Sequence, residues 1–276
     1  MSASADTATA VATPEFLITK EHRRFVEFAN AVREHRYVGV CYGPPGVGKT
    51  LSARHYAHWD LLGPWLDTHH HRDAQPPAIL ERARAVLYTP TTFVGARKLD
   101  EDLRHLCRGL AFAIQDHQHP DAEYIPSREL AAQAELVIVD EADRLKTATL
   151  EQLRDFFDRR QLGLILIGMP GLEKRLARYP QFYSRIGFAH RYRPLSADEL
   201  RFVLAHQWQR LGLTLDPSDF TDAEAIAAIA RTTNANFRLI GRLFAQIQRI
   251  LEINRLQTIT ADVVDAARET LVIGQP

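Results

Sequence analysis

The sequence predicts an α/β protein in which a parallel sheet lies between helical layers and is followed by a part that is helical throughout. Two apolar runs, 136–139 and 162–168, have the composition of strands that are buried on both faces. A third run, 37–42, leads into a glycine-rich loop, and helical patterns separate these runs along the chain. From Ser196 onward only helical patterns follow. At 276 residues the chain is long enough for such a fold and its core.

Composition limits the classes of partner. Lysine and arginine total 34 residues, as do aspartate and glutamate, so no overall field attracts the chain to nucleic acid or anionic lipid. No apolar run approaches transmembrane length, so no membrane partner is expected. Cys41 and Cys107 indicate neither a disulfide framework nor a zinc site, which favours a cytoplasmic location. The small and polar residues 1–14 are typical of a disordered tail.

The loop after the first apolar run has the spacing G-x-x-x-x-G-K-T of a phosphate-binding loop. Its glycines allow successive backbone N–H groups to point at an anion, and a helix that begins near Lys49 adds its positive dipole end. We expect Lys49 to reach the β- and γ-phosphates and Thr50 to bind Mg²⁺. The expected nucleotide contacts in this stretch are Gly43, Pro44, Pro45, Gly46, Val47, Gly48, Lys49, Thr50 and Leu51. A helical pattern over 15–35 precedes the strand, and its apolar face either walls a base pocket or is simply core.

The middle of the chain is less regular. Breakers at Gly63-Pro64 and Pro76-Pro77 predict an irregular segment over 59–77. Three adjacent histidines, 69–71, have no partner ligands at metal spacing, which favours a solvated loop over a metal site. The elements expected next are a strand over 85–89, a loop over 90–98, a helix over 99–115 and a short helix over 127–134.

Paired acids, Asp140 and Glu141, directly follow the apolar run 136–139. Open α/β sheets bind ligands at the carboxyl ends of their strands, so this pair is expected beside the phosphate-binding loop. Asp140 would hold Mg²⁺ through water, and Glu141 would orient and polarise the attacking water as a general base. The acid pair alone is often structural, but its combination with the loop upstream favours the catalytic interpretation.

Residues 172–193 form the most basic region of the chain. Most of its arginines are expected on a solvated face. Arg185 differs because it lies at a helix end just before the last expected strand, 188–192, where an arginine can reach the γ-phosphate bound by a neighbouring subunit. The expected catalytic residues are therefore Lys49, Glu141 and Arg185.

Pro194 separates an expected nucleotide-binding domain, 15–193, from an expected helical lid, 194–276. Ser196 and Thr221 each begin a capping box, Ser/Thr-x-x-Glu, that opens an apolar-periodic helix. The two remaining helices are expected over 234–253 and 260–271.

Together these motifs resemble an AAA+ ATPase over residues 15–271. The resemblance depends on GPPGVGKT, LVIVDEAD, the arginine of YSRI and the lid sequence NFRLIGRL. VIVDEADRL and IGMPGLEKRLARYPQFYSRIGFAHRYRPLS in a short chain are more particularly similar to the transposon-encoded ATPases of the TniB/TnsC/MuB group. The resemblance implies a three-layer αβα sandwich with strand order 5-1-4-3-2 and a C-terminal helical lid. It matches Arg185 to the arginine finger and Arg238 to the lid arginine called sensor II. The polar sensor I residue is missing at Gly168 or Met169, which predicts slow hydrolysis.

The same resemblance implies ATP and Mg²⁺ as cofactors and a homo-oligomer, either a ring or a helical filament, on double-stranded DNA. Such an assembly would select the transposition target, with a transposase and a target-selection adaptor protein as partners. Family geometry turns the loop 90–98 toward the DNA, where Thr91, Thr92, Arg97 and Lys98 suit sequence-tolerant phosphate contacts. An ordinary loop that leads into a helix is the alternative for this segment.

Three other functions remain open at this point. A helicase loader or initiator ATPase would share the nucleotide site but recruit a helicase. A nucleotide-dependent switch or chaperone would need no DNA. A slow or inactive hydrolase would act as a nucleotide-gated scaffold, in keeping with the missing polar sensor.

Overall fold

The computed structural model describes residues 16–67, 78–119 and 134–271. The tail expected over 1–14, the histidines 69–71 and most of the short helix expected over 127–134 lie outside these ranges.

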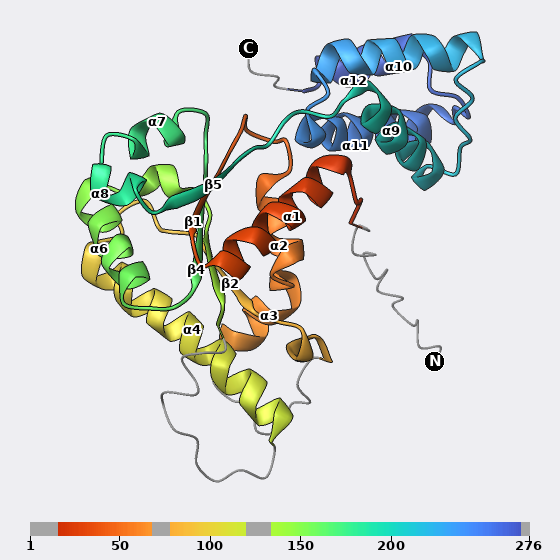
Figure 1. Cartoon of the computed structure of the whole chain (residues 1–276). Helices are drawn as coiled ribbons and strands as arrows, with labels where there is room; N and C mark the ends of the chain where they lie inside the picture. The colour runs from red at the N-terminus through yellow and green to blue at the C-terminus, as the bar shows by residue number, and fades with distance from the viewer. Residues whose placement is uncertain (1–15, 68–77, 120–133, 272–276) are drawn as a thin grey trace, which may run out of the picture.

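A five-stranded parallel sheet forms the centre of the described structure (Figure 1). Its strand order is β2-β3-β4-β1-β5, which is the expected order 5-1-4-3-2 written from the other edge. The α/β prediction and the strand order are therefore confirmed. The strands are β1 Val38–Tyr42, β2 Ala85–Tyr88, β3 Leu136–Val139, β4 Gly163–Gly168 and β5 Ile186–Arg191.

Helices cover both faces of this sheet, because the strands β1 to β4 are apolar and buried on both faces. Alternate residues of a strand point to opposite faces. In β4, Leu164 and Leu166 pack in one core cluster with α4 and α6, whereas Ile165 and Ile167 pack in another with α1 and α2. The elements of this part are α1 Lys20–His35, α2 Lys49–Tyr56, α3 Trp59–Asp67, η2 Ala78–Glu81, α4 Ala96–Gln118, η3 Ala142–Arg144, α6 Thr147–Asp158, α7 Leu172–Leu176 and α8 Pro180–Tyr183.

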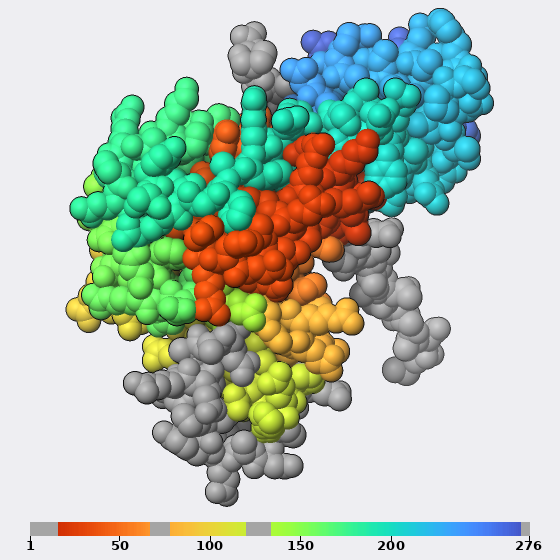
Figure 2. Space-filling model, viewed as in Figure 1, coloured from red at the N-terminus to blue at the C-terminus, as the bar shows by residue number. Residues whose placement is uncertain are grey.

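The C-terminal helices have a core of their own. Trp208, which is fully buried, packs edge-on against Phe244 with ring centroids 5.3 Å apart. Figure 2 shows these helices as a lobe that adjoins the segment containing α1. The four helices are α9 Ala197–Arg210, α10 Phe220–Thr233, α11 Phe237–Asn254 and α12 Ala261–Glu269.

Two carboxylates join this helical lobe to the sheet-bearing part. Glu199 completes the predicted capping box with Ser196, and its Oε1 also accepts the backbone N–H of Glu21 at 3.2 Å. The buried carboxylate of Glu21 accepts the backbone N–H of Arg193 at 3.3 Å, just before the chain enters the lobe. The start of α1 therefore fixes both the end of the sheet and the first lobe helix.

The structure corrects two local predictions. The segment expected to be irregular contains helix α3, with Pro64 inside it. Leu62 of this helix is fully buried and Trp65 packs against the core, so tertiary packing overrides the cost of an interior proline. Thr221 is not a cap, because α10 begins one residue earlier and Asp219 accepts the N–H groups of residues 221 and 222.

A buried chain of hydrogen bonds anchors the helix that follows the phosphate-binding loop. Ser52 Oγ of α2 lies 3.0 Å from His22 Nδ1 and 2.8 Å from the hydroxyl of Tyr192. These three residues belong to α1, to α2 and to the segment just after β5. Burial, assisted by nearby His55, lowers the pKa of His22 to about 4.

Across the described ranges, no helix combines the length and the apolar character that a bilayer crossing requires.

Asp219→Ala is expected to lower the free energy of unfolding by about 1 kcal/mol, because it removes the side chain that caps α10. Thr221→Ala is the matched control and should change stability by less than about 0.5 kcal/mol, since surface changes away from caps are small. Urea unfolding followed by circular dichroism measures both values. A larger loss in Thr221→Ala than in Asp219→Ala would favour the Thr221 box instead.

The free energy of unfolding is expected to fall as the pH drops from about 6.5 to about 4. In that range the unfolded chain binds a proton at His22 that the folded chain excludes, so acid favours unfolding. The pKa shift corresponds to at most about 3 kcal/mol, and above pH 6.5 this contribution is constant. Burial lowers the pKa of His55, His58 and His190 as well, which adds a change of the same sign. His22→Gln should flatten the measured slope, and an unchanged slope would contradict the assignment.

Candidate functional site

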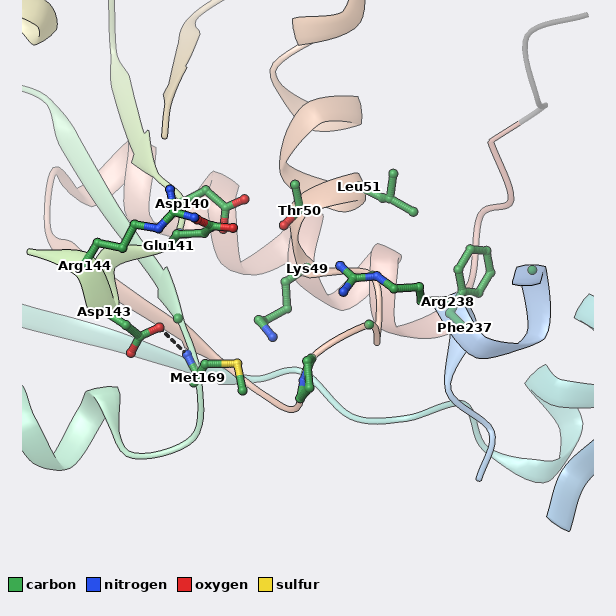
Figure 3. Close-up of a pocket in the computed structure, with 15 residues that line it drawn as sticks. Lys49, Thr50, Leu51, Asp140, Glu141, Asp143, Arg144, Met169, Phe237 and Arg238 are labelled. Atoms are coloured by element: carbon green, nitrogen blue, oxygen red, sulfur yellow. Dashed lines mark hydrogen bonds and ion pairs between the residues drawn. The ribbon is translucent and has the colours of Figure 1, made fainter. Parts of the chain in front are cut away.

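A cavity of about 610 Å³ lies where the ends of β1, β3 and β4 meet the start of α11 (Figure 3). These three strands are neighbours in the sheet, so their carboxyl ends share one edge. The phosphate-binding loop follows β1, the acid pair follows β3, and Met169 follows β4. The cavity is lined by Pro45, Gly46, Gly48, Lys49, Thr50, Leu51, Asp140, Glu141, Asp143, Arg144, Gly168, Met169, Phe237, Arg238 and Gly241.

Two glycines give the loop its shape. Gly46 has φ 77° and Gly48 has φ 113°, a region that residues with a Cβ rarely adopt. Gly48 is also the N-cap of α2, so the helix N-terminus opens toward the cavity. Backbone N–H groups at a helix N-terminus favour a bound anion, and phosphate is the anion that this loop spacing predicts.

Lys49 is held within its own loop. Its Nζ donates to the carbonyl oxygens of Gly43 at 2.6 Å and Pro44 at 2.7 Å. Burial lowers the pKa of Lys49, whereas the carboxylates of Asp140 and Asp143 oppose that shift and favour the charged form. Lys49 therefore lines the cavity, and two acids of the segment after β3 favour its charged form.

Thr50 and Asp140 supply oxygen ligands of the kind that Mg²⁺ prefers. Asp140 is buried, and its Oδ1 accepts the N–H of Glu141 at 2.9 Å, which leaves the other oxygen available. Within the described part of the chain, no group of three or more His, Cys, Asp or Glu residues could hold a metal by itself. The two residues thus fit a Mg²⁺ that takes most of its ligands from water and phosphate, as this ion commonly does.

Glu141 has an unusual backbone and an ionic partner. Its φ is 51°, in the left-handed region, and it caps the short helix η3. Its carboxylate forms an ion pair with Arg144, which also donates to the carbonyl oxygen of Pro90 at 2.9 Å. The side chain of Glu141 lies at the cavity wall, where a general base for an attacking water would be needed.

The helical lobe closes the cavity through α11. The backbone N–H of Arg238 donates to the carbonyl oxygen of Gly46 at 2.9 Å, and the amide of Asn236 donates to that of Pro45 at 2.7 Å. Figure 3 shows the side chain of Arg238 extending toward Lys49. A Cβ on Gly46 would lie 2.5 Å from Asn236 Oδ1, so this close contact requires glycine.

Several predicted site residues lie outside the cavity lining. Gly43 and Pro44 contribute their carbonyl oxygens to Lys49, and Val47 is buried in the core beneath the loop. Arg185 is remote from the cavity and forms a bidentate ion pair with Asp158 at 2.6 and 2.8 Å. Within one protomer, the structure therefore brings Lys49 and Glu141 together but not Arg185.

The segment proposed for DNA is shorter than expected. The loop ends at Gly95, so Arg97 and Lys98 lie in the first turn of α4 and not in the loop. Each is paired one turn away, Arg97 with Glu101 at 2.8 Å and Lys98 with Asp102 at 2.7 Å. Thr91 and Thr92 are exposed, together with Phe93, which is 87% exposed.

The sequence interpretation missed four residues of the lining, namely Asp143, Arg144, Phe237 and Gly241. Asp143 and Arg144 follow the acid pair within three residues, so their position in the sequence could have predicted that they line the cavity. Phe237 precedes the lid arginine, whereas Gly241 had no signal of its own.

Comparisons with known proteins agree with this geometry. A family model described as an AAA domain matches residues 32–176. A "potential ATP-binding protein" of Staphylococcus aureus is 43% identical over 266 residues, which cover 94% of this chain and 97% of the relative. The Mu-like prophage FluMu DNA transposition protein B of Haemophilus influenzae is 22% identical over 183 residues, 64% of this chain and 55% of that protein.

Solved structures share the fold. The Thermotoga maritima RuvB Holliday junction branch migration motor has a TM-score of 0.55 at 18% identity, over 92% of this chain and 70% of its own. The Aeropyrum pernix ORC2 protein has a TM-score of 0.56 at 16% identity, over 92% of this chain and 68% of its own. Domain III of the Thermotoga maritima replication initiation protein DnaA has a TM-score of 0.53 at 14% identity, over 91% of this chain and 92% of its own. With its phosphate-binding loop, acid pair and Arg238 around one cavity, the chain belongs to the AAA domain family of ATP-binding P-loop proteins.

Proposed function

We propose that this protein is a Mg²⁺-dependent ATPase that assembles on double-stranded DNA and regulates the choice of transposition target. The observation that carries the proposal is the cavity at the edge of the sheet, which combines a loop lysine, a strand-end acid pair and a lid arginine. In this proposal the loop holds the phosphates, Thr50 and Asp140 hold Mg²⁺, and Glu141 activates water. Residues 15–193 act as the nucleotide-binding domain and 194–276 as the lid.

In this proposal the lid couples the bound nucleotide to the conformation of the protein. Two hydrogen bonds connect it to the loop that would receive the phosphates: the backbone N–H of Arg238 donates to the carbonyl oxygen of Gly46, and the side-chain amide of Asn236 donates to that of Pro45. The charge of a bound triphosphate would also draw the guanidinium of Arg238 inward. A change from ATP to ADP would therefore alter the contacts that orient the lid, and with it the surface available to a neighbouring copy.

Assembly is proposed because one expected catalytic residue faces away from its own cavity. Arg185 lies directly before β5 and forms an ion pair with Asp158 of α6. In a ring or filament, the same arginine would complete the site of the adjacent subunit, where such fingers contribute on the order of 10³–10⁵ in turnover. Hydrolysis would then require contact between subunits.

The DNA and transposition parts of the proposal are supported by the resemblance to the TniB/TnsC/MuB group and by the relative named as a DNA transposition protein. Two exposed hydroxyls, Thr91 and Thr92, suit contacts with phosphate oxygens. The chain has no net charge, so binding would depend on many subunits that each add a few contacts. A transposase and a target-selection adaptor are the proposed protein partners, and the cytoplasm is the proposed location.

Lys49→Ala is expected to weaken ATP binding more than tenfold and to abolish ATP-dependent assembly on duplex DNA, because it removes the cation of the phosphate-binding loop. Fluorescent-nucleotide titration and electron microscopy of the protein with duplex DNA, with and without a non-hydrolysable ATP analogue, measure the two effects. Lys146→Ala, an exposed lysine outside the cavity lining, is the matched control. Intact assembly of Lys49→Ala would rule out the loop as the trigger, and the absence of salt-sensitive DNA binding in the wild type would favour a switch or chaperone.

Arg185→Ala is expected to bind ATP normally but to hydrolyse it at least tenfold more slowly, since its own cavity is intact. A mixture of Arg185→Ala with Lys49→Ala should recover part of the activity, because an intact arginine from one subunit meets an intact loop from the other. Steady-state phosphate release measures this recovery. If the mixture is no more active than its components, the site is not shared between subunits.

A further inference from the structure

The strand β4 carries no polar side chain at the cavity, and the structure gives a steric reason. Gly168 and Met169 are the residues that line the cavity at this strand end. A Cβ added to Gly168 would lie 2.6 Å from Asp143 Oδ2 and 2.7 Å from Leu172 Cδ2. Real Cβ atoms do not approach other atoms so closely, so a side chain at position 168 would require its neighbours to move. The space that such a side chain would need is occupied by the carboxylate of Asp143.

Asp143 is held in place from three directions. Its Oδ2 accepts the backbone N–H of Met169 at 2.7 Å, a contact drawn in Figure 3. Arg175 of α7 donates to the carbonyl oxygen of Asp143 at 2.9 Å and also to that of Leu145. Arg144, the next residue, is tied to Glu141 and Pro90. The short helix η3 therefore presents this carboxylate to the turn between β4 and α7 in a defined position.

The same carboxylate belongs to the cavity that also contains the lysine of the phosphate-binding loop. Lys49 and Glu141 line the same cavity as Asp143. A single side chain thus joins the β4–α7 turn to the wall of the cavity where the phosphates would lie.

We propose that Asp143 is a positioning residue for ATP hydrolysis. From its place on η3 it performs the task that a polar side chain on β4 would otherwise perform. It fixes the β4–α7 turn through the N–H of Met169, at the wall of the cavity that Lys49 and Glu141 also line. The inference depends on the proposed ATPase function and extends it to a residue outside the loop, acid pair, finger and lid arginine.

The test compares Asp143→Ala, Asp143→Asn and the matched control Asp155→Ala, an acid of α6 whose partner is Arg159 on the surface. Asp143→Ala is expected to lower kcat for ATP hydrolysis at least tenfold, while the Kd for a non-hydrolysable ATP analogue changes less than threefold. The amide oxygen of Asp143→Asn can still accept the N–H of Met169, so this variant should recover at least threefold of the lost rate. Asp155→Ala should match the wild type in both quantities.

Four results would overturn the inference. A kcat within threefold of wild type in Asp143→Ala would remove the residue from the reaction. A parallel loss of analogue affinity and kcat in both Asp143 variants would indicate a purely structural role, and the Asn variant keeps this test available if Asp143→Ala does not fold. Equal kcat values for the two Asp143 variants would exclude the contact with Met169. A wild type that does not turn over ATP would overturn the proposed function as well, whereas the other results leave that function intact.

Discussion

The adjacency of three strand ends is the constraint on which the candidate site depends. β4 lies between β1 and β3, and all three run parallel, so the phosphate-binding loop, the acid pair and the β4–α7 turn meet at one edge. Both faces of these strands are apolar and are covered by separate helical layers. A slip of one residue in the pairing would exchange the two faces, and side chains that now converge on the cavity would point elsewhere.

The helical lobe adds the second constraint, because it contacts the loop through the backbone as well as through side chains. The donors at residues 236 and 238 reach carbonyl oxygens of the loop almost two hundred residues earlier in the chain, at 2.7 and 2.9 Å. At the other side of the lobe, Glu199 and Glu21 connect its first helix to the start of α1 and to the end of β5. The lobe is therefore held at two points, one of which belongs to the cavity itself.

Local motifs predicted most of the fold and the centre of the site, because the physics of those motifs is local. The loop spacing, the acids after a buried strand and the Ser196 cap each follow from a few neighbouring residues. Features that arise from packing were not predictable in this way. Helix α3 tolerates Pro64 because Leu62 is buried by distant elements, and Asp143 reaches Met169 only because β3 and β4 are adjacent. The ion pairs that occupy Arg97 and Lys98 likewise depend on where α4 begins.

The pairing of Arg185 has a consequence for how easily this side chain can change partners. Asp158 is bound by Arg185 and also by Arg154, whose Nη1 lies 2.8 Å from its Oδ2. If Arg185 leaves Asp158, Arg154 still forms an ion pair with that carboxylate, so the charge of Asp158 remains compensated. Half-exposed ion pairs of this kind are typically worth less than about 1 kcal/mol. In the proposed assembly, the ion pair with Asp158 would therefore add little to the free energy needed to move Arg185 toward a polyanion.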